Sequence, residues 1–150
     1  MSSDLAELYQ EVVIDHSRRP RNCREMPDAH RHAEGYNPLC GDRISVYLKL
    51  ADDAVADVSF TGKACAICTA SASMMTQAVS GKGTRDVHEL FECVHDMAMG
   101  EPDADESPKL GKLAALAGVR RYPMRVKCAT LPWHTLKAAM EQTDDTVTTE

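Results

Sequence analysis

The chain has 150 residues, which is long enough for one domain with a sizeable hydrophobic core, and its formal net charge is −6. The acidic balance and the lack of any basic run argue against a nucleic-acid partner. No segment approaches about 18 consecutive apolar residues and no charged-then-apolar leader opens the chain, so we expect a cytoplasmic protein without a membrane partner.

The hydrophobic pattern of the first 60 residues predicts one helix and a hairpin. Apolar residues recur at helical spacing over residues 5–12, which predicts a helix that ends near Ser17. Apolar and polar side chains then alternate over residues 44–50 and again over 56–60, and the turn-forming pair Asp52-Asp53 separates the two runs. We therefore expect an antiparallel β-hairpin.

After Gly62 the pattern becomes helical. Apolar stripes over residues 67–78, 87–94 and 110–117 predict three helices, and the acidic, proline-containing segment 101–108 has the composition of a loop.

The last predicted helix runs from about Thr130 to Met140, with Pro132 in its first turn. The residues after it are almost all polar. We expect a single domain over residues 1–140 and a disordered tail over 141–150.

Three of the six cysteines stand in sequence settings that suit a metal ion. Cys40 lies in the run Asn-Pro-Leu-Cys-Gly-Asp that ends at Asp42, Cys65 follows Gly-Lys-Ala, and Cys128 lies in Arg-Val-Lys-Cys-Ala-Thr. Together with Asp42 they offer three thiolates and one carboxylate, donors that zinc accepts in tetrahedral sites. In a reducing compartment, metal binding or thiol chemistry is a better explanation of these cysteines than disulfides.

The neighbours of these cysteines bear on their reactivity. Cys65 precedes one predicted helix and Cys128 another, and because the positive end of a helix dipole favours a thiolate, we expect both to ionise more readily than a free cysteine. Gly41 permits a tight turn that could aim the side chains on either side of it at one point. Arg125 and Lys127 either stabilise the thiolate of Cys128 and meet an anionic partner, or are simply solvated charges.

These motifs resemble the IscU/NifU-type iron–sulfur assembly family, and within it the SufU branch. The resemblance is carried by residues 8–9, 15–16, 20–22, 37–42, 70–76 and 127–131, and it covers nearly everything but the tail. Several separated motifs in the right order are more specific than any one alone. The resemblance implies an α+β fold of the SufE/NifU (IscU-like) type, in which a small antiparallel sheet of about three strands packs against a layer of helices.

Two features favour the SufU branch. Lys127 occupies the position where scaffold-type members carry a histidine, and the long excursion between Cys65 and Cys128 is similar to the insertion of SufU-like proteins. The resemblance implies a zinc-dependent sulfurtransferase whose ligands are Cys40, Asp42, Cys65 and Cys128. It also implies that Cys40 accepts persulfide sulfur from a SufS-type cysteine desulfurase.

Two other functions remain open at this stage. The protein could be a scaffold that binds a [2Fe-2S] cluster and works with other iron–sulfur assembly proteins, because thiolates also ligate such clusters. Lys127 in place of histidine weighs against that scaffold. Alternatively, a structural zinc ion could support a non-catalytic adaptor.

The remaining cysteines and histidines are interpreted more simply. Cys68 completes a C-x-x-C pair with Cys65, and we favour a small buried hydrophobe over an alternative ligand or sulfur relay. Cys23 and Cys93 have no companions at ligand spacing and are expected to be buried structural thiols. Among the histidines, only His16 lies in a motif.

Overall fold

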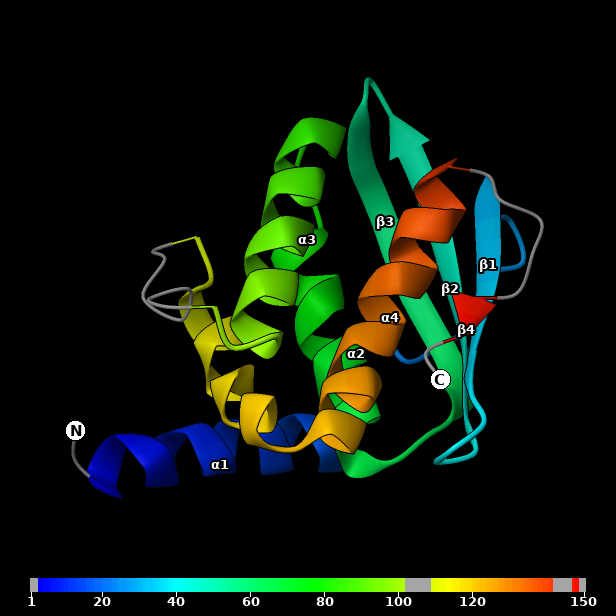
Figure 1. The fold of residues 1–150 in the computed structure, drawn as a ribbon. Coiled ribbons are helices and arrows are strands. Elements are labelled where there is room, and N and C mark those ends of the chain that lie inside the picture. Colours follow the sequence, from blue (N-terminus) through cyan, green and yellow to red (C-terminus); the bar gives the residue numbers. More distant parts are fainter. Residues whose placement is uncertain (1–2, 102–108, 142–146, 149–150) are drawn as a thin grey trace.

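A computed structural model describes residues 3–101, 109–141 and 147–148, and it has an α+β fold (Figure 1). The elements are α1 (Ser3–Arg18), β1 (Arg31–Asn37), β2 (Asp42–Ala51), β3 (Ala54–Lys63), α2 (Ala66–Val79), α3 (Thr84–Ala98), the 3-10 helix η2 (Gly111–Arg121), α4 (Pro123–Glu141) and β4 (Val147–Thr148). Helix α4 packs on β1 and β2, α2 packs on β3, and α1, α3 and η2 complete the helical layer. The predicted antiparallel sheet under a layer of helices is confirmed.

The sheet has the order β3-β2-β1-β4, with antiparallel pairs β1–β2 and β2–β3 and a two-residue parallel contact between β4 and β1. The predicted hairpin is formed by β2 and β3. Asp52 and Asp53 make its turn with positive φ angles of 53° and 59°, which aspartate tolerates better than most residues.

The core lies between the sheet and the two helices that touch it. Val46 and Leu48 of β2 and Val58 of β3 are at most 1% exposed. Each such side chain contributes roughly 1.5–3 kcal/mol relative to an exposed one. Helix α2 is buried on all sides along residues 70–76, as expected for a helix in the middle of a layer. Trp133 of α4 fixes the contact between the two helices, because its Nε1–H donates to Ser71 Oγ at 3.2 Å.

Strand β1 is short of large apolar residues, and the periodicity did not predict it. Its inward positions are Ala33, Gly35 and Asn37. Gly35 leaves room for α4, because a Cβ at this position would overlap Thr135 Oγ1 and lie 3.0 Å from Leu131 Cδ1. A small residue therefore sets how closely the last helix approaches the sheet.

Two of the predicted helices differ from those observed. A helix was predicted over residues 110–117, and the structure has the 3-10 helix η2 from Gly111 onward, which still buries its apolar side chains. Helix α4 begins at Pro123 and not near Thr130, so Pro132 lies inside the helix. The prediction was wrong because it took the second proline for the one at the helix start, where a missing N–H is harmless.

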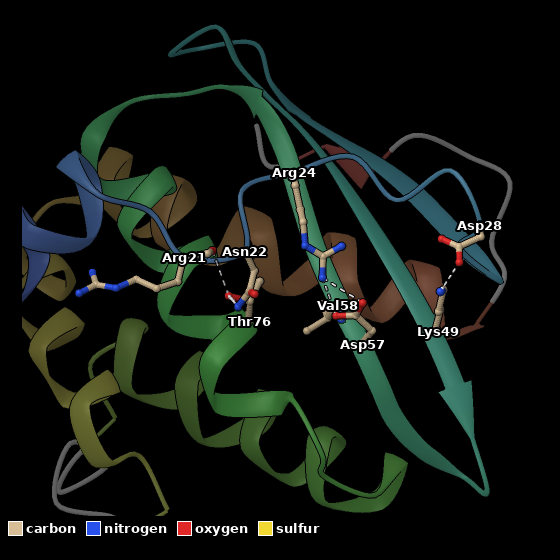
Figure 2. A network of polar contacts seen from close by, with 8 residues as sticks. All are labelled: Arg21, Asn22, Arg24, Asp28, Lys49, Asp57, Val58 and Thr76. Atoms are coloured by element: carbon tan, nitrogen blue, oxygen red, sulfur yellow. Dashed lines mark hydrogen bonds and ion pairs between the residues drawn. The ribbon is translucent and has the colours of Figure 1, made fainter.

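The connection between α1 and β1 is tied to α2 and to the sheet (Figure 2). Asn22 has a positive φ of 58° and donates its side-chain amide to Thr76 Oγ1 at 3.0 Å. Arg24 forms an ion pair with Asp57 of β3, in which Nη2 donates to Oδ1 at 2.8 Å and to Oδ2 at 2.9 Å. These contacts link the segment after α1 to the C-terminal part of α2 and to β3.

Several sequence expectations fall on or near residues outside the described part. The predicted loop at 101–108 lies outside it from residue 102 onward, as do residues 142–146 and 149–150 of the predicted tail. Glu141 is the last residue of α4, and Val147–Thr148 form β4. Among the helices that the structure describes, none is long and apolar enough to cross a bilayer.

Candidate metal centre

The β1–β2 loop, the start of α2 and the start of α4 lie at the lower end of the molecule in Figure 1, and these three segments carry the predicted ligands. Cys40 lies in the loop between β1 and β2, and Asp42 is the first residue of β2. The strand register pairs Asn37 with Asp42, so the loop spans only residues 38–41. Gly41 makes this turn possible with a φ of +73°, and its N–H donates to the carbonyl of Asn37 at 2.8 Å. The expected role of Gly41 is confirmed.

The other two cysteines come from helices. Cys65 is the N-cap of α2, and its sulfur accepts the backbone N–H of Cys68 at 3.4 Å. Its own N–H donates to Asp42 Oδ1 at 2.8 Å, which ties the start of α2 to the start of β2. Cys128 lies in the second turn of α4, so the expectation that it precedes a helix was wrong.

The distances between the donor atoms suit a single ion. Cys40 Sγ and Cys128 Sγ are 3.5 Å apart, and Cys65 Sγ lies 3.5 Å from Asp42 Oδ2. One ligand atom each from Cys40, Asp42 and Cys128 lies within 4.8 Å of the other two. Two sulfurs on a tetrahedral zinc ion, each about 2.3 Å from it, are separated by about 3.8 Å. The geometry is therefore close to what one ion requires, with Cys65 joined to the group through Asp42.

The four candidate ligands differ in how far they are buried. Asp42 is 2% exposed and Cys128 3% exposed, whereas Cys65 is half-buried and Cys40 is exposed. The centre is closed on three sides and open at Cys40. An exposed thiol can be reached by a partner's reactive sulfur, whereas the buried donors cannot.

Burial also reverses the expected effect on thiol ionisation. Desolvation raises the pKa of Cys65 and the pKa of Cys128, and for Cys128 the neighbouring thiols and Asp42 raise it further. The predicted lowering is wrong because loss of solvation outweighs the helix N-terminus at Cys65, and because Cys128 lies beyond the first turn of its helix. A cation would supply the positive charge that three thiolates and a carboxylate lack.

The two basic residues predicted to support Cys128 lie near it on α4. Arg125 is exposed and stacks its guanidinium over the ring of Tyr122, 4.6 Å from the centroid. Lys127 is half-buried, and neither residue has a described hydrogen bond or ion pair to the four candidate ligands. Both lie within three residues of Cys128 on α4, so their charge acts near the centre without direct bonds.

Asn37 is a member of the site that sequence reasoning did not single out. It is fully buried, its Nδ2 lies 3.8 Å from Cys128 Sγ, and its Oδ1 accepts the N–H of Leu39 at 3.1 Å. The available signal was its place in the motif that ends at Asp42. Its amide holds the Cys40 loop and faces the buried thiol at the same time.

Of the other three cysteines, Cys68 lies beside this group, because its backbone N–H donates to Cys65 Sγ. Cys68 is fully buried, and desolvation raises its pKa, which agrees with a small apolar role. Cys23 is exposed and Cys93 half-buried, so the expectation of a buried thiol was wrong for Cys23. His16, the histidine with motif support, lies against α2 and bonds Ser73.

Comparison with known proteins agrees with this architecture. Residues 8–129 match the model of the NifU-like N-terminal domain. The chain belongs to this family. It is 42% identical to the zinc-dependent sulfurtransferase SufU of Bacillus subtilis, over 91% of both chains, and 40% identical to the iron–sulfur cluster assembly scaffold protein IscU of Streptococcus pyogenes, over 93% of this chain and 87% of that protein.

Solved structures of relatives have the same fold. A putative iron–sulfur cluster assembly scaffold protein for the SUF system (FiSufU) from Fervidobacterium islandicum superposes with a TM-score of 0.77 at 32% identity, over 93% of this chain and 99% of that chain. The crystal structure of a hypothetical protein gives a TM-score of 0.81 at 39% identity, over 90% and 98%. The resemblance to the IscU/SufU family is confirmed, and its NifU-like fold with it.

The donor set of this NifU-like domain fits the metal chemistry of its relatives. Three sulfurs and one carboxylate oxygen suit zinc, and the same sulfurs suit an iron–sulfur cluster. The individual assignment of Cys40, Asp42, Cys65 and Cys128 as ligands, and of Cys40 as acceptor, stays a prediction.

Proposed function

We propose that this NifU-like domain is a zinc-dependent sulfurtransferase of iron–sulfur cluster assembly that accepts persulfide sulfur from a SufS-type cysteine desulfurase. Cys40 is the acceptor, and with Asp42, Cys65 and Cys128 it forms the ligand set. The observation that carries this proposal is the exposure of Cys40 beside partners that are largely buried. The relative named as a zinc-dependent sulfurtransferase supports it.

The buried residues hold the centre and the exposed one meets the partner. A bound zinc ion keeps thiols deprotonated at neutral pH, which these desolvated thiols need. Asp42 and Asn37 fix the two ends of the short loop that carries Cys40. The acceptor sulfur is thereby presented at the surface on a tight turn.

The transfer itself is a thiol–disulfide exchange. The Cys40 thiolate attacks the outer sulfur of the partner's persulfide, a new S–S bond forms, and the partner's S–S bond breaks. The electron pair of the broken bond leaves with the partner's cysteine as a thiolate, so no outside oxidant or reductant is needed. Arg125 and Lys127, near Cys128 on α4, favour an anionic persulfide at this end of the protein.

The acceptor assignment is tested by loading with sulfur. The zinc-loaded chain is incubated without oxygen with a SufS-type cysteine desulfurase and cysteine, and its intact mass is measured. We expect one added sulfur atom, lost in Cys40→Ser and retained in Cys23→Ser, which removes the other exposed thiol. Equal sulfur loading of the Cys40→Ser chain would refute the assignment.

A scaffold function is the second candidate, because another relative of similar identity is named as an IscU scaffold. Metal and acid-labile sulfide are therefore measured on protein isolated without oxygen or added metal. About one zinc per chain without sulfide supports transfer, and iron with matching sulfide supports the scaffold. An adaptor with a structural zinc ion predicts no sulfur loading at Cys40, so the loading measurement separates it from the transfer protein.

The compartment follows from the same chemistry. All six cysteines are free thiols, and a sulfur acceptor has to stay reduced between cycles. We therefore assign the reaction to the cytoplasm.

A further inference from the structure

A second site lies on the helical side of the molecule. A cavity of about 320 Å³ opens between α1, α2, α3 and the start of η2. Its lining residues are His16, Met74, Gln77, Ala78, Lys82, Leu90, Lys109, Leu110, Gly111, Lys112 and Leu113. Ligand sites in proteins begin at about 300 Å³, so the space suits a small molecule.

The charge of this cavity is opposite to that of the protein. Three lysines line it, Lys82, Lys109 and Lys112, and among its described lining residues there is no carboxylate, although the chain as a whole has a formal charge of −6. Lys109 is held by an ion pair with Glu89 at 3.0 Å. For Lys82 and Lys112, no side-chain hydrogen bond or ion pair is found among the described residues.

His16 adds an imidazole ring to the lining of the cavity. It is 4% exposed, and its Nδ1 lies 2.7 Å from Ser73 Oγ, which also accepts the backbone N–H of Arg21 at 2.8 Å. When the Ser73 hydroxyl donates to Nδ1, the ring is neutral and carries its proton on Nε2. Burial lowers the pKa of His16 and the charge of Arg21 lowers it further, while Asp15 acts in the opposite direction. The Nε2–H has no described partner.

The cavity is separate from the cysteine centre. The residues of α2 that line the cavity fall within 74–78, which is 9–13 residues after Cys65. At a rise of 1.5 Å per residue, these positions are about 14–20 Å from Cys65 along the helix axis. Sulfur transfer at Cys40 makes no use of the His16 motif, so this motif is free for another role.

We propose that this cavity binds a small organic anion. Its anionic group lies against Lys82, Lys112 and His16 Nε2–H, and its apolar body lies against side chains such as Met74, Leu90 and Leu113. Both parts are needed, since exposed lysines alone attract anions only weakly and an apolar wall alone has no charge preference.

The test uses phenyl phosphate, which joins a phosphate to an apolar ring, on the full zinc-loaded chain. Binding is followed by amide chemical-shift changes in ¹H–¹⁵N spectra, with phenol and inorganic phosphate as the two half-probes. We expect saturable shifts at residues 74–78 and 110–113, and weaker binding of each half-probe.

The variants assign the effect to the lysines. The double substitution Lys82→Gln and Lys112→Gln is expected to weaken phenyl phosphate binding about tenfold, since each exposed charge contact is worth up to about fivefold. Lys137→Gln is the matched control, because this lysine lies over the ring of Phe91 and does not line the cavity. The Lys137→Gln chain should bind phenyl phosphate as tightly as the unsubstituted chain.

Three results would each overturn the proposal. The first is the absence of saturable shifts at the cavity residues. The second is phenol that binds as tightly as phenyl phosphate. The third is a loss of binding in Lys137→Gln as large as that in the double variant of Lys82 and Lys112. None of them bears on the acceptor role of Cys40, which is read from sulfur loading.

Discussion

The substitution Gly35→Ala tests how the sheet and α4 fit together. The new Cβ would overlap Thr135 Oγ1 and lie 3.0 Å from Leu131 Cδ1, so α4 has to shift away from β1. Overpacking of this kind costs about 1–3 kcal/mol, and the loss of glycine's freedom in the unfolded chain returns about 0.4–1 kcal/mol. We therefore expect the free energy of unfolding to fall by roughly 1–2 kcal/mol.

Urea unfolding at saturating zinc measures this change, because a fixed metal concentration keeps the contribution of binding constant. With a slope of about 2 kcal/mol per molar urea, the midpoint should fall by about 0.5–1 M. Gly118→Ala is the control, since a Cβ there meets nothing within 4 Å. Thr135→Ala removes the overlapping oxygen, so in that background Gly35→Ala should cost clearly less. A change below about 0.5 kcal/mol, or an equal cost in both backgrounds, would refute the packing argument.

Three further predictions concern the site, pH and the surface. Asn37→Ala removes a fully buried amide and should lower the free energy of urea unfolding by about 1–3 kcal/mol, whereas Leu39→Ala, 56% exposed, should have little effect. Burial lowers the pKa of His134, so the folded protein binds fewer protons than the unfolded chain at mildly acidic pH. The free energy of unfolding should therefore fall as the pH drops below about 6.5 and through that lowered pKa. In thermal melts, the melting temperature of His134→Gln should depend less on pH over this range. Arg24→Ala breaks an exposed ion pair with Asp57 and should change the urea unfolding free energy by less than about 1 kcal/mol; a larger loss would show that this pair anchors the α1–β1 connection.

The sequence revealed the elements whose large side chains alternate or recur regularly. The hairpin of β2 and β3 was predictable because Val46, Leu48 and Val58 point inward in register. Strand β1 was not, because its inward positions are Gly35 and other small or polar residues, which carry no hydrophobic period. Its place in the sheet depends on long-range pairing and on the close approach of α4, which a local pattern does not encode.

The residue types of the candidate site were predictable, but their environment was not. The donors Cys40, Asp42, Cys65 and Cys128 were recognised by motif, and the fold brings three of them within 4.8 Å. The pKa values of the thiols were predicted to be lowered, and they are raised, because the prediction considered the helix ends and left out burial. Asn37 was overlooked because an asparagine becomes important only once it is known to be buried beside a thiol.

The unequal burial of the four donors is the feature that connects the fold to the proposed chemistry. Cys128 is held inside α4, and Cys65 is held at the N-cap of α2 by bonds to Asp42 and Cys68. Cys40 alone lies on an exposed turn, and its only described bond is to Cys128. A thiol that moves requires neighbours that do not, because the remaining donors have to keep their positions while one sulfur reacts. The same rigid neighbours would serve a cluster scaffold equally well. Sulfur loading of Cys40, together with the metal and sulfide content, therefore decides between the two functions.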